Sequence, residues 1–515
     1  MYQQKFHLYR NLTKPSERLY LSFAKAGASG EAQNPSYLIN EIRKLFPEIP
    51  VRDIEKEEKP EEKLEMPRSG EALFLEELGR AAEGEIDPLF EELYRWYAAH
   101  PEAGIPAETY RKAAFLRCAD GVIGKSAVSA LYGDTLKNSA TRLEKYAACA
   151  FAHFMEFGLQ IRERDQYELK AADMGTVMHE ALEKFSKKLQ ENGETWKTVT
   201  DDTRDRLIEE CVEETMADYG NTIFQSSSRN QYRIIRVKRI LKRTVWALQQ
   251  QIRQGEFEPG EFEVSFSMED SLSAINIDLS EHEKMRLRGR IDRVDLCETD
   301  DKVYVKIIDY KTGNTSLDLV ALYYGLQLQL AVYLDAAVEL EQKKHPGKQV
   351  EPAGVFYYHI DDPMLDQEED ETDEAWGRRM LKALRMDGLV NADRKVVELL
   401  DRVLEDGTTS DVIPVGKKKD GSYTSYSKVA SPEQFDVIRT YTRKKVREIG
   451  EGIFSGNVKI SPYQRDGATA CAYCEYQGIC GFDQKIQGYE YRKLKGMDTE
   501  PVSYTHLTLP TNSRV

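Results

Sequence analysis

The sequence has no long apolar run and few cysteines. None of its apolar stretches approaches the roughly 20 residues that cross a bilayer, and the first ten residues, MYQQKFHLYR, lack the apolar segment of a signal peptide. Seven cysteines in 515 residues, scattered and odd in number, exclude the disulfide framework of a small secreted domain. We therefore expect a cytoplasmic protein without a membrane segment.

Positive charge is also scarce, because Lys and Arg total 72 against 88 Asp and Glu, which gives a net charge of −16. Most of the excess is local: residues 53–65 and 361–374 together carry 13 of the 16 net negative charges. We expect the first stretch to lie in a solvated acidic linker over 53–69 and the second to form a loop. The rest of the chain is close to charge balance, which leaves room for a local basic groove.

A complete phosphate-binding loop is missing as well. The nearest candidate, Gly121-Val-Ile-Gly-Lys125-Ser126, has Ala119 where the motif requires a glycine. No ATPase site is predicted.

The length predicts about three domains. Residues 1–52 are too few for a domain and look like the end of a larger one, 70–135 read as a helical module, and 136–490 form a long mixed α and β unit. A tail follows over 491–515, in which 502–515 resembles translated sequencing adapter. The periodicity predicts strands over 18–23, 262–266, 287–296, 303–310 and 353–360, and helices over 37–45, 138–160, 173–190, 204–218, 230–254, 318–341, 392–408 and 432–453.

Two neighbouring strands carry a carboxylate pair. The short polar connection Glu298-Thr-Asp-Asp301 predicts a hairpin, whose cross-strand partners then have residue numbers summing to about 599–601. Asp292 and Asp309 sum to 601 and should face each other, with Lys311 on the side of Asp309 and Tyr310 pointing away.

Facing carboxylates repel each other unless a divalent cation lies between them, and oxygen ligands suit Mg²⁺ or Mn²⁺. Such a metal can activate water against a phosphodiester, and Lys311 can offset the developing charge. The alternative is a polar strand edge in which Asp292 and Arg293 form surface ion pairs.

Two accessory signals accompany this pair. His179 lies near the start of a predicted helix in Gly175-Thr-Val-Met-His179, and Gln329 and Tyr333 share a helix face at i and i+4. Each also has a structural interpretation, as a packed histidine or as packing side chains.

The order G-x-x-x-H, G-x-I-D, D-Y-K, Q-x-x-x-Y resembles the PD-(D/E)XK nucleases of the RecB type. The resemblance implies an α/β, restriction-endonuclease-like mixed sheet flanked by helices. It implies that His179, Asp292, Asp309 and the Tyr310 carbonyl bind the metal. The catalytic set would then be Asp292, Asp309 and Lys311, supported by Gln329 and Tyr333.

The cysteines give a second motif. Cys471, Cys474 and Cys480 form C-x2-C-x5-C, and a fourth ligand would come from Cys118, Cys149, Cys211 or Cys297. Spacing alone allows Zn²⁺, a [4Fe–4S] cluster or three inert thiols.

The same family has an iron–sulfur subgroup in which a distant cysteine precedes the nuclease core. Cys149 fits that position, although Cys-Ala-Phe stands here where the family usually has Cys-Pro-Phe. The resemblance implies a structural [4Fe–4S] cluster on Cys149, Cys471, Cys474 and Cys480. Because Cys149 and Cys471 are 322 positions apart, closing that loop removes roughly 5–6 kcal/mol of unfolded-state freedom. The remaining cysteines are then ordinary thiols.

A wider resemblance covers residues 1 to about 490. Tyr9 to Ser22 is similar to the end of the helicase-like domain in the AddB family, with Lys14-Pro15 where an active motor has an arginine, and Val458 to Cys480 is similar to AddB too. This resemblance implies that the chain is the C-terminal part of the B subunit of an ATP-dependent helicase–deoxyribonuclease. Its implied role is a Mg²⁺-dependent, single-strand-directed DNA exonuclease in double-strand break repair by recombination, with AddA as partner.

DNA would need local positive charge. A predicted helix offers seven basic residues without an intervening acid: Arg229, Arg233, Arg236, Lys238, Arg239, Lys242 and Arg243. The alternative is that they form an ordinary solvated helix face.

Two other functions compete. A non-catalytic DNA-binding or scaffold protein would usually have lost one of His179, Asp292, Asp309 and Lys311, which are all present. A stand-alone CRISPR-associated nuclease would leave residues 1–135 unexplained.

Overall fold

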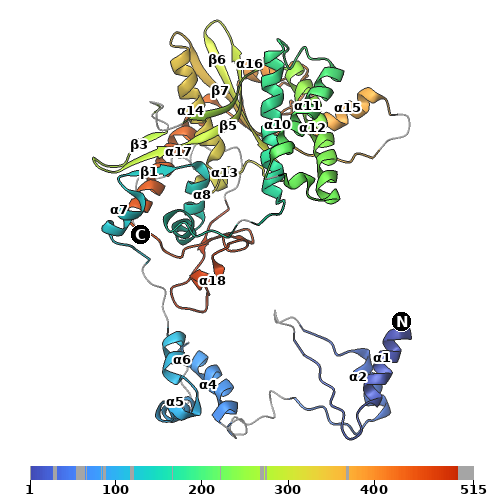
Figure 1. Ribbon diagram of the computed structural model, residues 1–515, viewed down its shortest axis with the longest axis vertical. Helices are drawn as coiled ribbons and strands as arrows, with labels where there is room; N and C mark the ends of the chain where they lie inside the picture. The colour runs from blue at the N-terminus through green and yellow to red at the C-terminus, as the bar shows by residue number, and fades with distance from the viewer. Residues whose placement is uncertain are drawn as a thin grey trace. The chain divides into compact units, whose positions relative to one another are not determined.

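The computed structural model describes residues 2–26, 32–53, 64, 67–82, 84, 88–115, 121–164, 166–220, 222–266, 272, 275–366 and 371–496. The chain divides into two compact units, Met1–Leu116 and Arg117–Val515 (Figure 1). Most of the acidic linker, Cys118 and the tail from residue 497, with the adapter-like segment, lie outside the described residues. Within the described ranges no helix is both long and apolar enough to cross a membrane.

The smaller unit is helical. Its helices are α1 (Tyr2–Thr13), α2 (Tyr37–Leu45), α4 (Pro67–Ala82), α5 (Pro88–Ala99) and α6 (Ala107–Ala114). The last three enclose a small core in which Phe74 stacks on Phe90 and contacts Tyr97. The helix expected over 37–45 is confirmed. The strand expected over 18–23 is wrong: these residues are irregular and exposed, and no described strand lies beside them to complete their backbone hydrogen bonds.

The larger unit is built on a six-stranded mixed sheet in the order β2-β5-β6-β7-β8-β9, which confirms the expected fold class. Figure 1 labels three of its strands, β5, β6 and β7. β5 is antiparallel to β2 and β6, β6 is parallel to β7, β7 is antiparallel to β8, and β8 is parallel to β9. The strands are β2 (Glu258–Phe266), β5 (Gly289–Glu298), β6 (Lys302–Lys311), β7 (Gln349–His359), β8 (Asp387–Asn391) and β9 (Val429–Ala430).

Helices cover both faces of this sheet. On one side Tyr304, Ile308 and Tyr310 of β6 enter a core with α10 (Ala171–Glu191), α11 (Asp201–Asp218) and α12 (Ser228–Gln254). The alternate residues Val303, Val305 and Ile307 enter a second core with α14 (Gln329–Lys344) and α17 (Pro432–Phe454). β6 is therefore apolar along most of its length, as a strand covered on both faces should be.

The expected register of the hairpin is confirmed, because β5 and β6 pair from Arg293 with Ile308 to Glu298 with Val303, a constant sum of 601. The helix expected over 318–341 is instead two helices, α13 (Leu319–Tyr323) and α14, with Gly325 at φ +77° between them. Such a left-handed residue ends a helix. The break places Gln329 at the first turn of α14.

Several elements were not expected, and the longest of them are α15 (Asp373–Ala383) and β8. The other short elements are α7 (Lys125–Tyr132), α8 (Ala140–Ala148), α9 (Ala150–His153), α16 (Arg394–Leu400) and α18 (Gln477–Cys480), with two small sheets of β1 (Thr135–Asn138), β3 (Asn276–Asp278) and β4 (Lys284–Leu287), and of β10 (Tyr463–Arg465), β11 (Ala468–Thr469) and β12 (Arg492–Lys493). α7 packs through Val128 into the second core, so the larger unit begins well before residue 136.

Candidate active site

The carboxylate of Asp292 is fixed by the neighbouring strand. Its Oδ2 accepts a hydrogen bond of 2.7 Å from the Tyr310 backbone N–H and lies 3.3 Å from Nδ1 of His179 on α10. The side chain of Asp292 has little access to solvent, since the residue is 9% exposed. Burial pushes the pKa of His179 down, but the hydrogen bond and charge of Asp292 outweigh it and raise that pKa.

Asp309 and Lys311 lie side by side on β6, as their alternation predicts. Lys311 Nζ is 2.6 Å from Asp309 Oδ2, and Asp309 is 1% exposed. Burial, followed by the charge of Asp292, raises the pKa of Asp309 to about 6, while Lys311 opposes this rise. The carboxylates of Asp292 and Asp309 therefore repel each other, and a divalent cation would relieve this repulsion.

Gln329 connects this pair to α14. Its Oε1 accepts a hydrogen bond of 2.9 Å from Lys311 Nζ, and its Nε2 donates to Asp309 Oδ1 at 2.9 Å and to the Tyr333 hydroxyl at 3.2 Å. The i and i+4 spacing thus brings Gln329 and Tyr333 together at the site. One amide orients both the lysine and the carboxylate.

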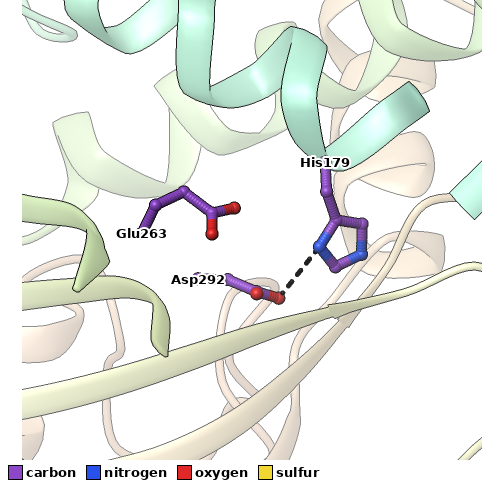
Figure 2. Close-up of side chains that lie close together, drawn as sticks. All are labelled: His179, Glu263 and Asp292. Atoms are coloured by element: carbon purple, nitrogen blue, oxygen red, sulfur yellow. Dashed lines mark ion pairs between the residues drawn. The ribbon is translucent and has the colours of Figure 1, made fainter. Parts of the chain in front are cut away.

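Glu263 joins the site, although it was not predicted from the sequence. Figure 2 shows its carboxylate facing His179 and Asp292, and one potential ligand atom from each of the three lies within 4.8 Å of the others. Burial and the charge of Asp292 raise the pKa of Glu263 to about 7. A cation would be stabilised among these groups.

The backbone explains why Glu263 could not be predicted. It adopts φ +51° in β2, a left-handed conformation that is rare for a side chain with a Cβ, just after a register shift between Pro259 and Glu261. Regular alternation assigns Glu263 only to the polar face of a strand. Its ion pair with Arg290 then aims the carboxylate, whose side chain is 6% exposed.

The donor set fits a divalent metal. Two carboxylates and one imidazole converge at one point, and the buried Oε2 of Glu263, although ion-paired with Arg290, accepts no hydrogen bond among the described residues. Asp309 is not part of this three-residue group. Its carboxylate contacts Lys311 and Gln329 and lies close enough to Asp292 for the charge of Asp292 to raise its pKa. The predicted ligand Tyr310 lies beside it, with its N–H bound to Asp292.

Glu144 is a second site residue that was not predicted. It projects from α8, and its Oε1 accepts the backbone N–H groups of Leu328 at 2.6 Å and Gln329 at 3.0 Å. Burial raises the pKa of Glu144 to about 7 against the effect of these two hydrogen bonds. It satisfies the free N–H groups at the start of α14 and so holds Gln329 in place.

The four predicted cluster cysteines come together elsewhere in the larger unit. Cys149, at the junction of α8 and α9, lines a cavity of about 350 Å³ with Cys471, Cys474 and Cys480. Burial raises the pKa of Cys471, and the other three thiols raise it further, so all four are within electrostatic reach. Four soft ligands around one cavity fit a tetrahedral metal or an iron–sulfur cluster.

The remaining described cysteines lie apart from that cavity. Cys211 and Cys297 are buried in the core beneath α10, α11 and α12. They therefore offer no fourth thiol to the C-terminal triplet.

The chain matches the model of the PD-(D/E)XK nuclease superfamily over residues 137–481. It is 42% identical over 509 residues to the second, or B-type, component of the ATP-dependent helicase/deoxyribonuclease of Lachnoclostridium phytofermentans, covering 97% of this chain and 43% of that protein. Proteins of the same name in Alkaliphilus metalliredigens and Clostridium tetani are 35% and 34% identical, each covering 97% of this chain and 44% of the relative. The chain thus spans less than half the length of these relatives. Because the superfamily match extends over most of the chain and contains both motifs described above, this chain belongs to the PD-(D/E)XK nuclease superfamily.

Proposed function

We propose that the chain is the C-terminal, nuclease-bearing part of an AddB-type protein, and that it hydrolyses phosphodiester bonds of DNA with Mg²⁺ or Mn²⁺. The observation that carries the proposal is the convergence of His179, Glu263 and Asp292 next to the Asp309–Lys311 pair. A relative that has lost its activity and serves only as a structural component does not need three potential metal ligands and a paired lysine within one site.

Each side chain then has a role. His179, Glu263, Asp292 and Asp309, with the Tyr310 carbonyl, would hold the metal, which polarises the phosphodiester and lowers the pKa of bound water. The Lys311 ammonium stabilises negative charge that develops on the phosphate oxygens. Gln329 orients Lys311 through a 2.9 Å hydrogen bond, and Tyr333 supports the Gln329 amide.

We also propose a [4Fe–4S] cluster on Cys149, Cys471, Cys474 and Cys480. Supporting it are the shared cavity and the placement of Cys149, 322 positions before Cys471 in the sequence but beside the C-terminal triplet in the fold. The cluster would be structural, because it would clasp α8 to the C-terminal segment.

Partner and substrate follow from the relatives, which are named as components of an ATP-dependent helicase/deoxyribonuclease. We propose an AddA helicase–nuclease as partner, unwound single-stranded DNA as substrate, and exonucleolytic degradation during recombinational repair of double-strand breaks.

The test is incubation of the purified chain with end-labelled single-stranded DNA and Mg²⁺. We expect degradation that stops with EDTA. Asp300→Ala, at the exposed tip of the same hairpin, is the matched control and should cut like the wild type. If protein that retains its iron fails to degrade DNA with Mg²⁺, the proposed function is contradicted.

A further inference from the structure

Two sets of basic residues on α12 differ in their contacts. Lys238 and Lys242 point towards α11, where they form ion pairs with Glu213 and Glu209. This set is neutralised within the fold. It is therefore an internal contact between two helices and is not available to a ligand.

The other set forms an exposed stripe along the N-terminal half of α12. At about 100° per residue, five side chains fall within roughly 120° of the helix circumference. We call them the arginine–tyrosine stripe: Arg229, Tyr232, Ile235, Arg236 and Arg239. In the described parts of the chain, no acidic side chain pairs with Arg229 or Arg236, and both are exposed.

The apolar members distinguish this stripe from a solvated charged face. Tyr232 and Ile235 are each 64% exposed, although they stand between arginines. Large apolar side chains left in water beside unpaired cations match the two needs of a single nucleic-acid strand. Base faces stack on aromatic rings, and phosphates pair with arginine.

The stripe also lies close to the catalytic edge of the sheet. Near its N-terminal end, Arg233 donates a 3.4 Å hydrogen bond to the carbonyl of Leu169, two residues before α10, the helix that carries His179. In the first turns of that helix, a Cβ built on Gly175 would lie 3.3 Å from Thr312, which follows Lys311. This end of the stripe is thus tied to the helix that enters the site.

The C-terminal end of the stripe reaches the same edge. Asp362 pairs with Arg239 and Arg243 at 2.6 Å each. It follows β7 by three residues, and the N–H of Ile360 donates a 2.8 Å hydrogen bond to the carbonyl of Lys311. Because β6 and β7 are parallel, their carboxyl ends lie together, so this contact stands at the end of the catalytic strand.

We propose that the arginine–tyrosine stripe binds single-stranded DNA and guides it to the Asp309–Lys311 site. Tyr232 stacks on a base, with Ile235 beside it, and Arg229 and Arg236 contact phosphates. Duplex DNA does not use Tyr232 in this way, because its base faces are already stacked. The inference rests on the proposed function for its ligand class and adds the surface that holds the strand.

The test measures binding without cleavage, by fluorescence anisotropy of a labelled oligothymidine of about 16 nucleotides with the purified chain in EDTA. We expect Tyr232→Ala to weaken binding about 5- to 150-fold, the loss of one stacked base, and Tyr232→Phe to retain it. Arg229→Ala and Arg236→Ala should each reduce the slope of log K against log salt by about 0.7. Lys238→Ala and Lys242→Ala, on the same helix, are the matched controls and should bind within about twofold of wild type.

Three results would overturn the inference. They are unchanged binding by Tyr232→Ala, an equal loss in the two lysine controls, and an equal loss for duplex and single-stranded probes in Tyr232→Ala. Each leaves the proposed function standing if the chain still degrades DNA with Mg²⁺. Wild-type protein that neither binds nor cuts DNA overturns both.

Discussion

Glu144 permits a prediction that separates its role as an acceptor from its charge. Glu144→Ala leaves the N–H groups of Leu328 and Gln329 without their acceptor at the partly buried start of α14. An unsatisfied buried N–H costs about 1–3 kcal/mol, and since these two groups are only partly buried, this variant should lose roughly 1–3 kcal/mol of unfolding free energy in total. Gln329 would also lose its fixed position, and cleavage should fall with it. Glu144→Gln keeps an oxygen acceptor and should retain the unfolding free energy and most of the cleavage activity.

The charge of Glu144 adds a pH dependence of defined sign. Burial raises its pKa from 4.5 to about 7 in the folded chain, so between these values the folded state binds more protons than the unfolded state. Stability must then fall as pH rises through that window, by on the order of 3 kcal/mol from this group. Glu144→Gln should lack this component and should be at least as stable as the wild type at pH 8.

The assay is urea unfolding of the wild type and both variants at several pH values, combined with cleavage of single-stranded DNA. Glu448→Ala, which removes an exposed acid paired with Lys445, serves as the control and should change stability by less than about 0.5 kcal/mol. The reasoning is refuted if Glu144→Ala unfolds like the wild type, or if Glu144→Gln is as damaged as Glu144→Ala.

Two further predictions concern the metal sites. Cys149→Ala should lose iron and destabilise the larger unit by roughly 5–6 kcal/mol, the free energy of loop closure, while Cys211→Ser keeps its iron. Elemental analysis measures the iron content and thermal unfolding measures the stability. Zinc in place of iron, or loss of iron in Cys211→Ser but not in Cys149→Ala, would contradict the cluster assignment. Glu263→Gln should raise the Mg²⁺ concentration needed for half-maximal cleavage at least tenfold, because a charged ligand becomes neutral, whereas Glu258→Gln, an exposed residue on the same strand, should leave the Mg²⁺ titration unchanged.

The local parts of the site could be predicted from the sequence. A hairpin with a short polar turn allows only a narrow range of registers, which placed Asp292 opposite or close to Asp309, and period-two alternation placed Lys311 beside Asp309. Helical spacing likewise placed Gln329 and Tyr333 on one face. These inferences needed only neighbouring residues in the sequence.

The residues that could not be predicted depend on long-range packing or unusual backbone geometry. Glu263 reaches the site through a left-handed residue in a bulged strand, and no alternation rule gives that conformation. Glu144 lies 185 positions before Gln329 and meets it only because α8 packs against the start of α14. Likewise, the break between α13 and α14 depends on the left-handed φ of Gly325, which the helical pattern of the sequence does not predict. The four cysteines were grouped through a family resemblance, which the fold supports by bringing them to one cavity.

The central claim is that Asp309 and Lys311 belong to a metal-dependent DNA-cleaving site, and the most direct measurement is the rate of Mg²⁺-dependent degradation of end-labelled single-stranded DNA by Asp309→Ala and Lys311→Ala. Both variants should bind the oligonucleotide in EDTA like the wild type. We expect both to fold, because Lys311 is partly exposed and Asp309, although buried, is a carboxylate whose charged form is disfavoured by burial and by Asp292. We expect cleavage to fall by a hundredfold or more, since losing a ligand or a charge stabiliser typically costs about 10²–10³ in rate. Retained cleavage above about a tenth of the wild-type rate in either folded variant would contradict the assignment.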